Sequence, residues 1–139
     1  MNPMSNSLRH IRFAVVALAL ACLISCRSSS QQYAPIVSQA ISWDKATQYI
    51  GKDVTVTGSV VGITYAVHSR GSPTFINLGL NYPDPARLTV VIWGEDRDKF
   101  KPNPEKTYQG KNLYVRGVVG EYKGSPQIVV KLPEQIEAK

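Results

Sequence analysis

The chain has 139 residues, which leaves room for one domain and an appendage. Its 16 lysines and arginines exceed its 10 aspartates and glutamates, and this net charge of +6 permits binding to a polyanion without requiring it. Both cysteines, Cys22 and Cys26, belong to the N-terminal appendage, which excludes a disulfide, a thiolate metal site and a catalytic thiolate from the rest of the chain.

The N-terminus has the pattern of a secretory signal. The basic residues Arg9, His10 and Arg12 precede an apolar run at 13–24, which is too short to span a bilayer as a helix. The next feature, Leu23-Ile24-Ser25-Cys26, resembles the bacterial lipobox, in which the signal is cut just before a lipidated cysteine.

This resemblance divides the chain into three parts. We expect a signal peptide at 1–25, a flexible tether at 26–40 that begins with lipidated Cys26, and a folded domain at 41–139. An uncleaved anchor and lipidation at Cys22 are the alternatives. Loss of the signal leaves 14 basic against 10 acidic side chains, a net charge of +4. The expected location is the cell envelope, as a membrane-anchored lipoprotein on the periplasmic face or the cell surface.

The folded part begins with a predicted short amphipathic helix at 41–51. Ser42 suits the N-cap, Asp44 suits the first turn, and Gly51 suits a left-handed C-cap. The apolar residues that would pack against the domain stand at helical spacing: Trp43, Ala46 and Ile50.

Five strands are predicted after this helix. The first, at 54–67, alternates apolar and polar residues and is long enough to need bends, which Gly58 and Gly62 would allow. The others are expected at 74–80, 88–93, 112–122 and 127–132, with a charged short turn or helix at 94–100.

One tetrapeptide pattern, a cation followed by Gly-Ser-Pro, occurs twice between strand-like runs, at Arg70–Pro73 and Lys123–Pro126. Each copy has a similar strand before it and an apolar strand after it. The repetition predicts two hairpins of one design, each with a cation at its turn.

Five strands with a long bent first strand and an insertion between the third and fourth resemble the OB-fold, and in detail the bacterial single-domain OB-fold proteins of the anticodon-binding type. The stretches that carry this resemblance are 51–58, 73–79, 91–97, 122–130 and 133–136. It implies an all-β fold with small α content, a five-stranded Greek-key barrel with a short N-terminal helix. It also implies a ligand face on the second and third strands, flanked by the loops that carry the two tetrapeptides.

Candidate ligand residues follow from this face. Arg70 and Lys123 could meet a phosphodiester backbone, or they could be solvated turn tips. In the second strand Ile76 fits the interior, which leaves Phe75 and Asn77 facing outward to stack on a base and to bond its edge. A bulge would reverse this register and bury Phe75.

Further candidates extend the same surface. Trp93 either shares the outer face with Phe75 or plugs one end of the barrel. Arg87, Arg116 and Lys131 could extend a basic path. The remaining aromatics considered, Tyr65, Tyr82, Tyr114 and Tyr122, are typical packing residues.

The sequence offers little for catalysis. The acidic group Glu95, Asp96 and Asp98 suits a helix start, and His68 is the only histidine after the signal. We expect no enzyme activity, no cofactor and no metal site.

These features predict a lipid-anchored, non-catalytic OB-fold binding module, with single-stranded nucleic acid or a similar polyanion as partner and the membrane as a second contact through the lipid. The alternative is an interaction module for an envelope protein or glycan, because nucleic acid is scarce outside the cytoplasm.

Overall fold

The structure, a computed structural model, describes residues 39–139. The predicted signal peptide, Cys26 and all but the last two residues of the tether therefore lie outside the described residues. Within 39–139, no helix is long and apolar enough to cross a membrane.

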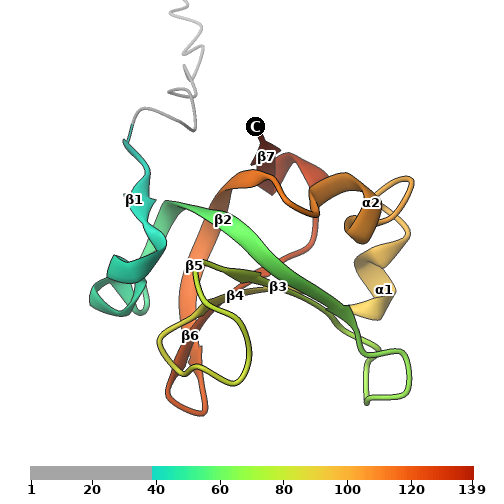
Figure 1. Ribbon diagram of the computed structural model, residues 1–139, viewed down its shortest axis with the longest axis horizontal. Helices are drawn as coiled ribbons and strands as arrows, with labels where there is room; N and C mark the ends of the chain where they lie inside the picture. Colours follow the sequence, from blue (N-terminus) through green and yellow to red (C-terminus); the bar gives the residue numbers. More distant parts are fainter. Residues whose placement is uncertain (1–38) are drawn as a thin grey trace, which may run out of the picture. The chain divides into compact units, whose positions relative to one another are not determined.

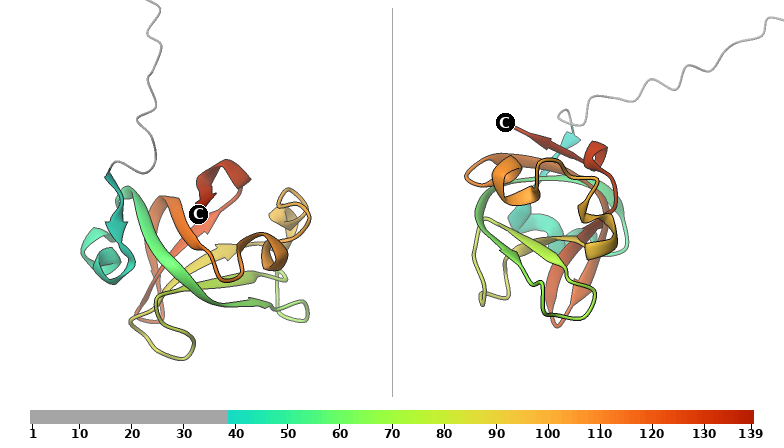
Figure 2. Two further views of the ribbon diagram at one scale, coloured as in Figure 1. Left: turned by 45° about the horizontal axis from the view of Figure 1, so that its top comes forward. Right: turned by 90° about the vertical axis from the view of Figure 1, so that its right-hand side faces the viewer.

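Five strands close into a barrel (Figure 1). They are β2 (Asp53–Tyr65), β3 (Thr74–Leu78), β4 (Leu88–Ile92), β5 (Asn112–Tyr122) and β6 (Ser125–Val130). Their order is β2-β3-β4-β6-β5, and a further pairing of β5 with β2 completes the circle. Only the β4–β6 pair of this circle is parallel. This is the Greek-key topology of the OB-fold, as the sequence predicts. Figure 2 shows the strands wrapping around a common interior.

The long first strand closes the barrel because it serves two partners. Its first half, Asp53–Ser59, pairs with β5, and its second half pairs with β3 after a register shift between Val60 and Gly62. Glycine is needed at Gly58, since a Cβ atom there would lie 2.8 Å from the ring of Trp43. The irregularity predicted near Gly62 is therefore present, whereas Gly58 lies in regular pairing with β5 and makes room for Trp43.

The remaining elements lie outside the circle of five strands. They are β1 (Ile41–Ser42), the 3-10 helix η2 (Trp43–Tyr49), α1 (Gly94–Arg97), α2 (Pro104–Tyr108), the 3-10 helix η3 (Pro133–Gln135) and β7 (Ile136–Ala138). Of these, β1 extends the sheet by pairing with β2. The alternation of residues did not predict β7, which pairs with β5.

The N-terminal helix differs from its prediction in type and facing. Ser42 precedes it without a side-chain capping bond, and the helix has the 3-10 form. Three residues per turn place Trp43, Ala46 and Tyr49 toward the barrel, whereas Ile50 is 41% exposed. The predicted packing of Ile50 is therefore wrong, because it assumed α-helical spacing.

The interior of the barrel follows the predicted alternation. Ile76 and Leu78 of β3 and Leu88, Val90 and Ile92 of β4 are fully buried in one cluster. Their neighbours in sequence consequently face outward and form the surface on which the candidate site lies.

The two tetrapeptides do not form hairpins of one design. The first lies in a loop at 66–73, and Pro73 directly precedes β3. In the second, Lys123 and Gly124 alone make a tight turn, with φ values of 48° and 79°, and Ser125 and Pro126 already belong to β6. The pairing partners of the flanking strands, and not the tetrapeptide, set the length of each connection.

Candidate nucleic-acid interface

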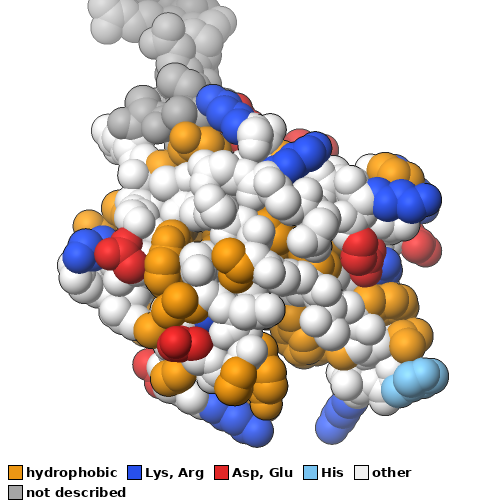
Figure 3. All heavy atoms as spheres, viewed as in Figure 1, with side chains coloured by type: hydrophobic (Ala, Val, Ile, Leu, Met, Phe, Trp, Pro, Cys, Tyr) orange, Lys and Arg blue, Asp and Glu red, His pale blue; other side chains and the backbone are white. Residues whose placement is uncertain are grey.

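A groove of about 340 Å³ lies on the outer face of β3, β4 and β6. Its walls are the β2–β3 loop on one side and, on the other, the β3–β4 loop together with the β5–β6 turn. In the view of Figure 3 the lower part of the molecule is hollowed between these two groups of loops, and basic side chains stand at both tips.

Two cross-strand rows run across the outer face of β3, β4 and β6. Asn77, Thr89 and Gln127 stand in register on β3, β4 and β6 and form a polar row. The next outward row on these strands is apolar and consists of Phe75, Val91 and Val129, of which only Phe75 lines this groove. The half-buried Phe75 ring lines the groove, so its outward direction is confirmed, and no bulge buries it.

The side chain of Asn77 links the β3–β4 loop to β4 through hydrogen bonds. It is 5% exposed, its Nδ2 donates to Asn81 Oδ1 at 2.9 Å, and its Oδ1 accepts from Thr89 Oγ1 at 3.1 Å. The backbone N–H of Tyr82 also donates to Asn81 Oδ1. The carboxamide of Asn77 therefore fixes the β3–β4 loop and keeps one N–H for a ligand.

The β3–β4 loop carries an aromatic and a cation to the groove. Tyr82 is 75% exposed, and the guanidinium carbon of Arg87 lies 5.2 Å from the centre of its ring. Arg87 Nη1 also donates to the carbonyl oxygen of Asp84 at 2.6 Å and to Ser125 Oγ at 3.5 Å. Arg87 thus joins this loop to the start of β6, at the mouth of the groove.

The β5–β6 turn supplies a second pair of this kind. Tyr122 is 60% exposed and lines the groove, and Lys123 Nζ lies 5.4 Å from the centre of its ring. The sequence interpretation of Tyr82 and Tyr122 as packing residues is wrong for both. Their positions beside turn residues were the available signal, because a turn holds its side chains away from the core.

Arg70 and Lys123 flank the groove from opposite ends. The pairing of Leu78 with Leu88 and of Thr89 with Gln127 brings the β5–β6 turn next to the β3–β4 loop. The β2–β3 loop, which carries Arg70, adjoins the other end of β3. The two loops therefore frame the predicted face from opposite ends.

Trp93 belongs to the β2–β3 loop end and does not line the groove. It is 37% exposed, and a Cβ atom on Gly71 would lie 3.0 Å from its ring. Gly94 N donates to the carbonyl oxygen of Gly71 at 2.9 Å. Trp93 consequently supports the loop that bears Arg70 and is separate from Phe75.

Arg116 and Lys131 line a second groove, on the outer face of β5 and β6. Arg116 Nε lies 3.8 Å from Asp53 Oδ1, and both side chains are about half exposed. The structure thus brings Phe75, Asn77 and Arg87 together in one groove and Arg116 and Lys131 in another.

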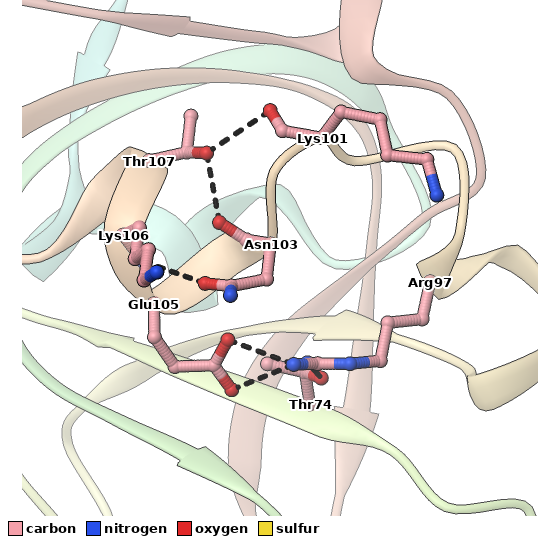
Figure 4. Close-up of polar contacts among 7 residues, drawn as sticks. All are labelled: Thr74, Arg97, Lys101, Asn103, Glu105, Lys106 and Thr107. Atoms are coloured by element: carbon pink, nitrogen blue, oxygen red, sulfur yellow. Dashed lines mark hydrogen bonds and ion pairs between the residues drawn. The ribbon is translucent and has the colours of Figure 1, made fainter.

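Arg97 anchors the β2–β3 loop at its base (Figure 4). Its Nη2 donates to both carboxylate oxygens of Glu105 at 2.8 and 3.0 Å, and its Nη1 donates to Thr74 Oγ1. Its guanidinium carbon also lies 3.8 Å from the centre of the Tyr65 ring. The insertion between β4 and β5 is thereby tied to the start of β3 and the end of β2.

Burial raises the pKa of Glu105, but the hydrogen bonds and charge of Arg97 lower it more, so this pKa lies below its ordinary value of 4.5. The carboxylate therefore remains charged at neutral pH. The acidic residues Glu95 and Asp96 stand in the first turn of α1, as predicted, and Asp96 Oδ1 pairs with Lys99 Nζ at 2.6 Å. The prediction is wrong for Asp98, which is the C-cap residue, because this helix has only four residues.

The sequence matches no protein-family model and no curated protein. Among solved structures, an aspartyl-tRNA synthetase from Entamoeba histolytica is similar with a TM-score of 0.51 and 14% identity, over 77% of this chain and 23% of that one. An asparaginyl-tRNA synthetase from Entamoeba histolytica, in complex with asparaginyl-adenylate, gives 0.46 and 20%, over 71% and 23%. A putative aspartyl-tRNA synthetase from Leishmania major gives 0.45 and 12%, over 73% and 21%.

This chain spans less than a quarter of the length of each of these synthetases. At such identities the similarity concerns the fold alone. The match with a TM-score of 0.51 agrees with the barrel topology: the described part of the chain has an OB-fold.

Proposed function

We propose that this protein is a lipid-anchored, non-catalytic OB-fold module that binds single-stranded nucleic acid or a similar polyanion in the Phe75 groove. The observation that carries the proposal is the composition of this groove. Three aromatic rings, Phe75, Tyr82 and Tyr122, line it, and the cations Arg87 and Lys123 stand against two of them.

This combination suits unpaired bases on a charged backbone. Stacking of a base on an aromatic ring contributes about 1–3 kcal/mol and tolerates any base, while cations at the rim meet the phosphates. The rings are accessible only to bases that are not stacked in a duplex, which favours a single strand. The names of the synthetases that share the fold specify tRNA, which is a nucleic acid and agrees with this ligand class.

A binding role without chemistry fits the same side chains. The groove offers aromatic faces, amides, hydroxyls and cations, which can hold a ligand by stacking, hydrogen bonds and charge. The lipid anchor and the envelope location rest on the lipobox-like sequence around Cys26.

The test is fluorescence anisotropy with labelled oligo(dT) of 12 nucleotides and the full chain in detergent micelles, over a series of salt concentrations. We expect saturable binding that weakens with salt on a linear log–log plot. Phe75→Ala should weaken binding about 5- to 150-fold, which corresponds to the loss of about 1–3 kcal/mol of stacking.

The control is the double variant Lys45→Ala with Lys106→Ala. Both lysines are exposed and neither lines a groove, so their loss lowers the net charge without touching the site. Affinity that falls equally in this control and in a matched Arg87→Ala, Lys123→Ala variant would contradict a local phosphate contact. Absence of binding at low salt would refute the proposed function.

A further inference from the structure

The second groove, which holds about 640 Å³, adjoins the Phe75 groove and shares a residue with it. Gln127 lines both. It pairs across the sheet with Thr89 on one side and with Gly120 on the other, so the two grooves meet on β6. No side-chain hydrogen bond within residues 39–139 engages the Gln127 carboxamide, which leaves its donors and acceptor available at this junction.

The floor of the junction is open at Gly120. A Cβ atom there would meet only Gln127 atoms at 3.8 and 3.9 Å, which is ordinary van der Waals contact, and its φ is not in the left-handed region. Neither packing nor backbone conformation requires this glycine. By contrast, Gly117 is required, since a Cβ atom would lie 2.7 Å from Ile128 Cγ2. An unneeded glycine inside a strand weakens the strand and lets a ligand approach the backbone closely.

The two cations of the second groove are held in place through their backbones. Gln135 Oε1 accepts from the N–H of Lys131 at 2.8 Å and of Leu132 at 3.1 Å, while its Nε2 donates to the carbonyl oxygen of Arg116 at 3.0 Å. One side chain therefore fixes the backbone at Arg116, inside β5, and at Lys131, just after β6. Lys131 forms no ion pair with any residue in 39–139, and Arg116 meets Asp53 only through the long contact at Nε.

We propose that the second groove is a phosphate-binding extension of the first, along which a longer single strand passes over Gln127 and Gly120 to Arg116 and Lys131. This inference rests on the proposed function of the Phe75 groove. From Gln127 to Lys131 the strand advances about 13 Å at ~3.3 Å per residue. That length accommodates roughly two to four further nucleotides, given a spacing of at least about 3.4 Å along one strand.

The test is a length series of labelled oligo(dT), with 3, 6, 9 and 12 nucleotides, titrated into the full chain in detergent micelles. For the unmodified protein we expect affinity to rise at least about tenfold from the shortest bound length to 12 nucleotides. The double variant Arg116→Gln, Lys131→Gln should keep its affinity for the shortest bound length within about twofold and lose most of the rise. Its salt slope for 12 nucleotides should fall by about 1.4, from ~0.7 for each lost contact.

Two further variants separate a local contact from a general effect of charge. Gly120→Val leaves the charge unchanged and fills the junction, so it should also remove the gain with length. Lys45→Gln with Lys106→Gln removes the same charge elsewhere and should leave the gain intact. Circular dichroism checks that each variant is folded.

The outcomes distinguish the two proposals. Equal weakening of all lengths by the Arg116 and Lys131 variant, or no loss of the gain, would overturn the extension. If the short oligonucleotides still bind in a manner that depends on Phe75, the proposed function stands. If no length binds, both proposals fail.

Discussion

The ring of Trp43 leaves no room for a side chain at two separate positions of the chain. Its ring packs on Gly58 in β2 and on Gly79, which follows β3, and this contact joins the N-terminal 3-10 helix to the barrel. Gly79 has a φ of 74°, and a Cβ atom there would lie 1.9 Å from the Trp43 ring. Gly79 is therefore required for two independent reasons.

Gly110 is a matched comparison for Gly79, because its φ is 71° but nothing lies within 4 Å of its Cβ position. Gly110→Ala should lower the free energy of unfolding by about 1–2 kcal/mol through left-handed strain alone. Gly79→Ala should cost about 1–3 kcal/mol more through overpacking. Urea unfolding followed by tryptophan fluorescence measures both values, and equal losses would contradict the Trp43 contact.

Phe75 and Asn77 show how far single residues can be read from sequence. Alternation along β3 predicts that both face outward, and both line the groove. The partners of Asn77 could not be predicted in the same way. Asn81 belongs to an irregular loop and Thr89 to another strand, so only the folded chain brings these three polar groups together.

At the scale of elements, Lys123 supplies a charge in the β5–β6 turn, although another residue would suit the backbone of this turn better. Both of its residues have positive φ, a conformation that favours Asn-Gly over Lys-Gly. Lys123→Asn should therefore raise the free energy of unfolding by about 0.5–1 kcal/mol. The same change should weaken oligo(dT) binding and reduce its salt slope by about 0.7.

Lys123→Ala is the control for this prediction. It removes the charge without improving the turn, so it should weaken binding equally and leave the protein no more stable. Unchanged affinity in Lys123→Asn would mean that this cation makes no phosphate contact.

The ion pair of Glu105 in α2 with Arg97, which also bonds Thr74 of β3, should make the stability of the protein sensitive to acid. Because the pKa of Glu105 is lowered in the folded state, its carboxylate contributes stability that is present above the unfolded-state pKa and lost as pH falls through the folded-state pKa. As pH falls below the ordinary glutamate pKa of 4.5, the free energy of unfolding should therefore fall more steeply in the unmodified protein than in Glu105→Gln.

Urea unfolding at a series of pH values measures this difference. The control is Glu134→Gln, because Glu134 is exposed and forms no ion pair within residues 39–139. It should leave the slope close to that of the unmodified protein. A slope in Glu105→Gln as steep as in the control would show that the Arg97 contact does not hold the carboxylate.

At the scale of the whole molecule, the proposed anchor decides where the groove meets its ligand. Lipid on Cys26 would hold the chain at a membrane, since each buried methylene contributes about 0.8 kcal/mol. Metabolic labelling with radioactive palmitate should mark the unmodified chain and Cys22→Ser, but not Cys26→Ser. Label that persists in Cys26→Ser would contradict lipidation at this residue.

Much of the barrel follows from the sequence alone. The sequence predicts all five strands, alternation predicts the buried side of β3, and the strand bounds at 112–122 agree with the structure. These features are local, because the side chains of a strand alternate whatever strand it pairs with. The barrel closure and the two loops that frame the ligand face came instead from the resemblance to the OB-fold.

Only the tertiary structure decided how these parts form a site. Pairing across the sheet placed Arg70 and Lys123 at opposite ends of the groove and brought Tyr82 and Tyr122 to its mouth. In the folded chain the helix at Trp43 has three residues per turn. The cations are divided between two grooves, which are joined at Gln127. Such arrangements depend on contacts between residues far apart in the chain, and the repeating pattern of one segment contains no information about its partners.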